Sequence, residues 1–179
     1  MNRFDEIIAS RRSIRHFDAT RPVKSEEIEQ MIAASIEAPS WKNSQTARYH
    51  VVQSPEMAAR LREALAPQNQ ISADGASALI VTTFVSNRSG FERNGEPTNE
   101  LGNGWGIYDL GLHNAFLLLK AADLGIDTIV LGLRNAEKVR SALQIPSEET
   151  IVSIIAVGHR SKDALRPKRK TTKEISKFY

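Results

Sequence analysis

The run Arg11, Arg12, Ser13, Ile14 and Arg15 gathers residue types that could hold a phosphate group. A guanidinium offers bidentate, charge-assisted donors, and a serine hydroxyl adds a further donor. A basic run of this kind is also typical of a solvated surface segment. Taken alone, the pattern favours the surface segment over the phosphate site.

A second basic cluster lies between His159 and Lys173, where Asp163 is the single acidic residue. Its cationic members are Arg160, Lys162, Arg166, Lys168, Arg169, Lys170 and Lys173. The cluster could be a solvated tail, or it could contact nucleic acid weakly by neutralising phosphates. No aromatic residue is interleaved with it to stack on bases, so we predict no nucleic-acid partner.

Several kinds of chemistry are excluded by residues that are missing or wrongly spaced. The chain has no cysteine, which removes thiolate nucleophiles and cysteine-ligated metals and fits a reducing, cytoplasmic compartment. The four histidines are far apart in the sequence, so we predict no metal site. Gly102, Gly104 and Gly106 fail the spacing of a dinucleotide-binding fingerprint, and no nucleophile elbow is present. We therefore predict no catalytic side chain and favour chemistry supplied by a cofactor.

The length and composition limit the architecture. At 179 residues, with 41% hydrophobic and 25% charged residues, the chain can bury one sizeable core, so we expect a single domain over residues 1–179. Arg3, Asp5 and Glu6 interrupt the start of the chain, which predicts no secretory signal. The longest apolar stretch, residues 110–124, contains polar and charged residues and is too short for a membrane span. We expect it to be a buried core helix.

Capping residues and apolar spacing predict the helices that must position the basic clusters. Asn2 is expected to cap a first helix that ends near the arginine run, and a second helix begins at Ser25 and stops at Pro39. Pro67 is expected to end the helix that follows Ser54. Further helices are predicted over Trp105–Leu124 with a stop at Gly125, after Asn135, and in a capping box of Thr171 with Glu174.

Four apolar runs predict strands. They are Tyr49–Gln53, Ala78–Val85, Thr128–Leu131 and Ile151–Val157. Because Ala78–Val85 is continuously apolar or β-branched, we expect it to be a central strand that is covered on both faces. Alternation of these strands with helices would by itself suggest a parallel sheet. Residues 86–104 lack periodicity and are unusually long for a connection, so we expect a lid or a disordered segment.

Five motifs occur in a fixed order along nearly the whole chain. They are the run of residues 11–18 (RRSIRHFD), the loop of residues 38–45 (APSWKNSQ), Trp105-x-x-x-Asp109-x-Gly111, Val130-Leu131-Gly132, and Gly158 followed by Arg169-Lys170. In this order the motifs resemble those of the FMN-dependent nitroreductases and flavin reductases. The loop is similar to that family's Ala-Pro-Ser-x-x-Asn-x-Gln segment.

The resemblance implies a fold that differs from the one suggested by local alternation. It implies an α+β nitroreductase-like fold, with a mixed and largely antiparallel sheet flanked by helices. Two such chains would form an intertwined homodimer with two flavins at the interface. We adopt this expectation in place of the parallel sheet.

The resemblance also implies which residues bind FMN. Arg11, Ser13 and the Arg169–Lys170 pair would hold the phosphate, although which two of Lys168, Arg169 and Lys170 contact it is left open. Arg15 would lie near N1 and the C2 carbonyl of the ring. Arg12, counted with the same cofactor-binding run, is expected to contact the backbone or to have no role.

Other cofactor contacts come from more distant segments. By resemblance, Pro39, Ser40 and Asn43 approach the flavin from the partner subunit, and Asn69 would hydrogen-bond the pyrimidine edge of the ring. The backbone around Leu131 and Gly132 would face N5. Trp41 and residues 86–104, which include Phe91, are expected to shape the mouth for substrate.

Three functions are compatible with this sequence. In the first, NADH or NADPH delivers a hydride to flavin N5 and leaves, and a nitroaromatic, a quinone or free flavin then takes the electrons in a ping-pong scheme. In the second, the protein is a non-redox basic module that binds nucleic acid or another polyanion. In the third, it is a flavin enzyme of the same family with a different reaction, such as dehalogenation or consumption of flavin.

Overall fold

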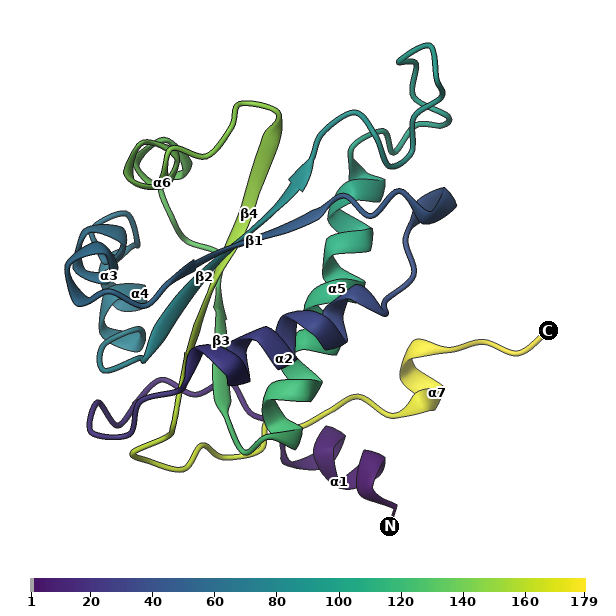
Figure 1. Ribbon diagram of the computed structural model, residues 1–179. Coiled ribbons are helices and arrows are strands. Elements are labelled where there is room, and N and C mark those ends of the chain that lie inside the picture. The colour runs from purple at the N-terminus through teal and green to yellow at the C-terminus, as the bar shows by residue number, and fades with distance from the viewer. Residues whose placement is uncertain (1) are drawn as a thin grey trace.

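The computed structural model describes residues 2–179 and contains a sheet of four strands in the order β1-β2-β4-β3 (Figure 1). The strands are β1 (Ala47–Val52), β2 (Ala78–Val85), β3 (Asp127–Leu131) and β4 (Glu149–Gly158). All three pairs of neighbouring strands are antiparallel. The α+β fold with an antiparallel sheet that the resemblance implies is confirmed, and the parallel sheet suggested by local alternation is wrong.

Helices cover both faces of the sheet (Figure 1). One face packs against α2 (Ser25–Ile36) and α5 (Gly104–Asp123), and the other against α3 (Pro55–Arg62), α4 (Pro67–Ser72) and α6 (Ala136–Leu143). Alternate residues of β2 point to opposite faces, so Ile80 lies in the core beneath α2 and α5 while Val81 lies in the other core. Double coverage explains why β2 is buried at seven of its eight positions. A continuously apolar run therefore indicates coverage on both faces and says nothing about strand direction.

The sequence locates several helix ends correctly. The Asn2 side chain accepts a hydrogen bond from the Asp5 amide at 3.0 Å and caps α1 (Arg3–Ser10). Thr171 and Glu174 form the predicted capping box of α7 (Thr172–Ile175). Gly125 ends α5 with φ +74°, a conformation that favours glycine. Short side chains and glycine are reliable signals here because their effects act within one helical turn.

One proline was misinterpreted. Pro67 does not end the helix after Ser54; that helix, α3, ends at Arg62, and Pro67 occupies the first turn of a separate helix, α4. Proline is favoured at this position because its missing amide donor is not needed there and its φ is already helical. The error matters because α4 carries Asn69, one of the expected cofactor ligands.

The segment of residues 86–104 is a series of hydrogen-bonded turns, so it does not form a disordered loop. This segment contacts the short 3-10 turn η1 (Trp41–Asn43) through an ion pair between Lys42 and Glu92. At the start of α5, Gly106 allows the helix to pass close to the ring of Phe84 on β2, where a side chain would collide. None of the helices in residues 2–179 is both long and apolar enough to cross a membrane.

Candidate functional site

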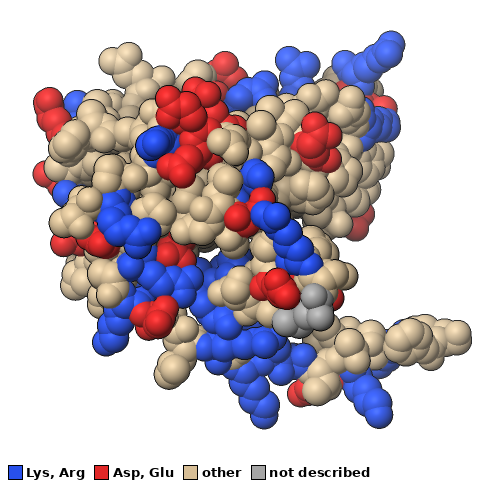
Figure 2. All heavy atoms as spheres, turned by 60° about the horizontal axis from the view of Figure 1, so that its bottom comes forward, with Lys and Arg blue, Asp and Glu red and all other residues tan. Residues whose placement is uncertain are grey.

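The two basic clusters of the sequence come together beside β3. After α1, Ser13 forms a parallel bridge with Thr128, and the Ile14 amide donates to the Thr128 carbonyl at 3.0 Å. After β4, the chain returns to the same place, where the Asp18 amide donates to the His159 carbonyl at 2.8 Å. Figure 2, in which the bottom of Figure 1 comes forward, shows lysine and arginine side chains gathered around a hollow on this side.

A cavity of about 180 Å³ lies at this junction. Its walls come from the end of α1, the loop between α5 and β3, and the segment after β4. Basic residues dominate the lining: Arg11, Arg12, Arg21, His159 and Arg160. Asp127 is the one acidic residue among the lining residues that the structure describes.

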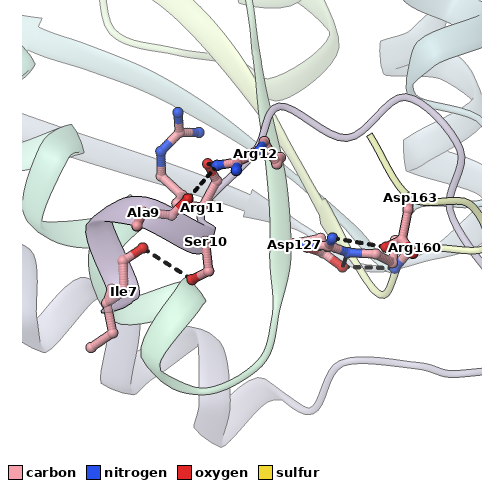
Figure 3. Close-up of polar contacts among 8 residues, drawn as sticks. All are labelled: Ile7, Ala9, Ser10, Arg11, Arg12, Asp127, Arg160 and Asp163. Atoms are coloured by element: carbon pink, nitrogen blue, oxygen red, sulfur yellow. Dashed lines mark hydrogen bonds and ion pairs between the residues drawn. The ribbon is translucent and has the colours of Figure 1, made fainter. Parts of the chain in front are cut away.

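Asp127 neutralises Arg160. The Arg160 guanidinium donates to the Asp127 carboxylate at 2.5 and 3.0 Å, and the Arg160 amide donates to it at 2.8 Å (Figure 3). These hydrogen bonds raise the pKa of Arg160 above its usual range, with a further contribution from Asp163 at 3.1 Å. Arg160 and Asp127 therefore form a structural pair that leaves the remaining arginines of the cavity without this counter-charge.

Arg12 is engaged by its own backbone. One nitrogen of its guanidinium donates to the carbonyls of Ala9 and Arg11, each at 2.7 Å (Figure 3). Carbonyls at the end of a helix lack partners within the helix, and a cation there also interacts favourably with the helix dipole. Arg12 thus fixes the end of α1 and the direction in which the neighbouring residue, Arg11, projects.

Arg11 lies beside other positive charges. Within residues 2–179 its guanidinium has no ion pair and no hydrogen bond, and Figure 3 shows none. Burial lowers the pKa of Arg11, and the charges of Arg169 and Arg12 lower it further. A bound anion would relieve this repulsion, so the surroundings of Arg11 fit a phosphate group. The influence of Arg169 on the pKa of Arg11 shows that the C-terminal segment lies close to Arg11. This segment also carries Lys168 and Lys170, and all three of its basic residues are exposed.

A second group of expected ligands lies around α4. The Asn69 side chain donates to the Leu133 carbonyl at 3.2 Å, and the Ala66 amide donates to the same carbonyl at 3.0 Å. These bonds fasten α4 to the turn that follows β3 and carries Leu131 and Gly132. The Leu131 side chain is buried, whereas Gly132 is exposed beside a cavity of about 550 Å³.

The backbone at Gly132 is open to a ligand. A Cβ atom added at Gly132 would meet no atom within 4 Å, so a flat group could approach this peptide closely. On the other side of α4, Arg15 lines a cavity of about 560 Å³ together with Gln70 and Ile71. Arg15 is exposed, and among the described residues its guanidinium forms a hydrogen bond with the Ser13 carbonyl alone, at 3.4 Å. It is therefore available to a ligand that lies across α4.

The loop with Pro39, Ser40 and Asn43 is not part of this group. Figure 1 shows η1 and α4 on opposite sides of the sheet. Within the loop, the Ser40 hydroxyl accepts from the Gln45 amide at 3.0 Å, and Asn43 adopts a left-handed conformation with φ 56°. Arg11 and Ser13 thus lie beside β3, and Asn69, Leu131 and Gly132 lie at the end of this strand. Pro39, Ser40 and Asn43 precede β1, the strand at the other edge of the sheet.

Sequence reasoning missed two features. Arg21 and His159 line the basic cavity. Arg21 stands alone as a basic residue in the sequence, and His159 appears only at the boundary of the second basic cluster, so neither carries a signal for this role. Asp109 was noted only as a motif residue, yet its buried carboxylate accepts hydrogen bonds from Trp41 and Ser89. A polar residue on the apolar helix of residues 105–124 was the available signal for that role.

The structure thus combines an antiparallel α+β fold with a cavity beside the sheet that is lined by several basic residues. The chain matches the sequence model of the Nitroreductase family over residues 8–92 and 74–159, and it belongs to this family. The chain is thus an oxidoreductase of a family that generally binds a flavin.

Three relatives illustrate the similarity. A Bacillus subtilis protein named as an NAD(P)H nitroreductase, YodC, is 26% identical over 194 residues, which cover 96% of each chain. Iodotyrosine deiodinase 1 of Rattus norvegicus is 27% identical over 96% of this chain and 68% of its own. The crystal structure of CLA-ER, an enone reductase of gut-bacterial fatty acid saturation, superposes with a TM-score of 0.87 at 23% identity, covering 99% and 98% of the two chains.

Proposed function

We propose that this oxidoreductase binds FMN, takes electrons from NADH or NADPH, and gives them to a small acceptor in a ping-pong sequence. The acceptor would be a nitroaromatic, a quinone or a free flavin. When bound, FMN would supply the redox chemistry by accepting a hydride at N5 and releasing two electrons to the acceptor. The observation that carries the proposal is the group formed by Arg11 and Arg169, whose mutual repulsion a phosphate would relieve.

The phosphate would be held by Arg11, Ser13, Arg169 and Lys170. A phosphate dianion requires about two cations, and each charge-assisted hydrogen bond contributes roughly 1.5 to 3 kcal/mol. Arg12 would act indirectly, because its guanidinium holds the end of α1 and thereby the backbone of Arg11. Asp127 keeps Arg160 neutralised, so the charge offered to the phosphate comes mainly from Arg11 and the C-terminal segment.

The ring would lie over the exposed peptide at Leu131 and Gly132. Asn69 would meet the pyrimidine edge, and its bond to the Leu133 carbonyl keeps α4 and this peptide together as one support. Arg15, across α4, would place a positive charge near N1 and the C2 carbonyl. A cation at this position raises the reduction potential of a flavin. No acid or base from this chain is required in the scheme.

The proposal includes an intertwined homodimer in which Pro39, Ser40 and Asn43 approach the partner's flavin. Their location on the far side of the sheet from α4 supports it, because one protomer cannot bring both groups to the same ring (Figure 1). Large apolar side chains on α1, α5 and the C-terminus are also exposed, which is typical of a surface that is covered in the assembly. They are Phe4, Ile8, Ile107, Tyr108, Phe116, Ile175, Phe178 and Tyr179.

Some buried polar atoms have no partner within residues 2–179, among them side-chain atoms of Tyr49, His113 and Asn114. Tyr49 and His113 line a cavity of about 310 Å³ between α2, β1 and α5. Because these atoms are already covered within one protomer, they do not bear on the dimer. One FMN-binding domain over residues 1–179 and a cytoplasmic location, where reduced nicotinamides are available, belong to the same proposal.

A different reaction on the same flavin is the second candidate. The relative named a deiodinase favours this candidate, since its similarity extends over most of this chain. Analysis of products distinguishes it from reduction of nitro groups or quinones: halide release from a halogenated phenol would indicate dehalogenation.

The experiment that tests the proposal is a reduction assay with NADH and NADPH against a panel of nitroaromatics, quinones and free flavins. We expect turnover with at least one acceptor and parallel lines in double-reciprocal plots, which are characteristic of ping-pong kinetics. No nicotinamide oxidation with any acceptor, in protein that has been saturated with FMN, would refute the proposed function.

A further inference from the structure

One buried carboxylate joins the loop of Pro39–Asn43 to the segment of residues 86–104. Asp109, on α5, is only 2% exposed. Its Oδ2 atom accepts a hydrogen bond from the Trp41 amide at 3.0 Å and another from the Ser89 hydroxyl at 2.5 Å. Ser89 is itself 1% exposed, so its hydrogen bond is shielded from water, and the bond from the Trp41 amide is partly buried. Two segments that are about 50 residues apart in the sequence therefore share one acceptor atom.

Further contacts close the same junction. The rings of Trp41 and Trp105 are 4.5 Å apart with an interplanar angle of 50°. The Trp105 indole nitrogen donates to Asn99 at 2.9 Å, which connects this tilted pair of rings to the end of the 86–104 segment. Lys42 and Glu92 add an exposed ion pair at 3.3 Å. Of these contacts, the hydrogen bond from the Trp41 amide to Asp109 is the one that holds a backbone group.

The loop needs such an anchor because its backbone is unfavourable. Lys42, Asn43 and Gln45 have φ values of 46°, 56° and 47°. These values lie in the left-handed region, which residues other than glycine adopt rarely. Residues in such conformations persist where the surroundings determine them, and they occur often at ligand sites. The anchor to Asp109 precedes Lys42 directly, at the amide of Trp41.

Burial of a carboxylate at this position costs more free energy than burial of a neutral hydrogen-bond acceptor would. No lysine, arginine or histidine forms an ion pair with Asp109 in the part of the chain that the structure describes. Burial of a charge without a countercharge is costly, so a purely structural contact would be better served by a neutral group. The geometry points to a role for Asp109 in the site itself.

We propose that Asp109 is a positioning residue for the acceptor site. Its carboxylate holds the Pro39–Asn43 loop and residues 86–104 in one arrangement, so the two walls of the mouth over the partner's flavin form as a unit. The inference rests on the proposed function, in which Ser40 and Asn43 approach that flavin. Its consequence is that loss of the carboxylate weakens binding of the acceptor more than binding of FMN, because the proposed phosphate contacts of Arg11 and Arg169 remain.

The test uses the two tryptophans, which are the only ones in the chain. Two indole rings this close couple their electronic transitions, which gives a pair of circular-dichroism bands of opposite sign. Asp109→Leu removes the acceptor atom, whereas Asp109→Asn keeps a side-chain oxygen that can accept the same bonds. We expect Asp109→Leu to lose the paired signal, Asp109→Asn to keep most of it, and the control Lys42→Gln to leave it intact. Ser89→Ala, which removes one donor, is expected to weaken it and serves if Asp109→Leu does not fold.

Kinetics give the second readout on purified FMN-bound protein. We expect the acceptor KM of Asp109→Leu or Ser89→Ala to rise about tenfold, the size of one lost buried hydrogen bond, while kcat and FMN content stay within about twofold. A full paired signal in folded Asp109→Leu and Ser89→Ala, or an unchanged acceptor KM in both, would overturn the role of Asp109. Absence of flavin or turnover in the unmodified protein would contradict the proposed function instead, and the dichroism would then still test the junction.

Discussion

At the scale of residues, the basic run of Arg11 to Arg15 divides into different roles. Arg12 binds the carbonyls of Ala9 and Arg11, and Arg15 lies exposed near α4. Arg11 lies beside Arg169 and has no counter-ion among residues 2–179. The sequence shows that all three are cations but cannot show which guanidinium is already satisfied by the backbone. That distinction depends on where α1 ends and where the C-terminal segment returns.

Because Arg11 and Arg12 have different roles, substitutions of these two neighbours should affect different properties of the protein. Arg11→Gln should weaken FMN binding by about 10- to 100-fold, the loss of one charge-assisted contact of roughly 1.5 to 3 kcal/mol. Arg12→Gln should instead lower the melting temperature, because the carbonyls of Ala9 and Arg11 lose their donor. Fluorescence titration of the FMN-free proteins and thermal unfolding measure the two effects. Normal FMN affinity in Arg11→Gln together with strong loss in Arg12→Gln would contradict the assignment.

At the scale of elements, the sequence predicts what is decided locally. Asn2, Ser54 and Asn135 each accept a backbone hydrogen bond at the start of a helix, as expected from residue type alone. Strand direction depends on contacts between distant segments, and the apolar run of β2 was compatible with either arrangement. The resemblance to a family supplied the antiparallel sheet because it carries information about the whole chain.

A polar cluster of His50 on β1, Thr83 on β2 and Glu149 on β4 predicts that the free energy of unfolding depends on pH. Glu149 is buried at the start of β4, accepts a hydrogen bond from Thr83 and lies 2.7 Å from His50 Nε2. Burial acts to raise the pKa of Glu149, but the hydrogen bonds from Thr83 and His50 outweigh it, and the net pKa is lowered. A carboxylate whose pKa is lower in the folded state stabilises the fold above its unfolded pKa, roughly 4.3, and this stability is lost as the pH falls through the folded value.

Urea unfolding at neutral and acidic pH measures this effect. Glu149→Gln should be less stable than the unmodified protein at pH 7, and its stability should fall less between pH 7 and about pH 4, since the titrating group is gone. Glu148→Gln is the matched control, because Glu148 is the exposed neighbour. An identical decline with pH in the Glu149→Gln variant would show that another group is responsible.

At the scale of the whole molecule, the expected cofactor ligands fall into two sets at opposite edges of the sheet. The set with Arg11 and Gly132 lies near β3, and the set with Ser40 and Asn43 lies beyond β1 (Figure 1). Motif order in the sequence predicts both sets but does not separate them, since separation follows only from the fold. The proposed homodimer accounts for the separation.

Mixed dimers test this arrangement. Arg11→Ala and Asn43→Ala should each impair activity, and co-expression of the two variants should restore about a quarter of the unmodified activity. About half of the dimers would then be mixed, and each mixed dimer would contain one intact site out of two. Activity of the purified single variants gives the background. No recovery in mixed dimers, or a monomer in sedimentation experiments, would contradict the shared site.

The most direct test of the central claim is the flavin content of the protein purified under native conditions. The cofactor is released by heat, identified by mass and quantified, and the intact protein is titrated anaerobically with NADH and NADPH. We predict about one FMN per chain, with absorption bands that bleach on addition of a reduced nicotinamide. A colourless protein that cannot be reconstituted with FMN would contradict the account.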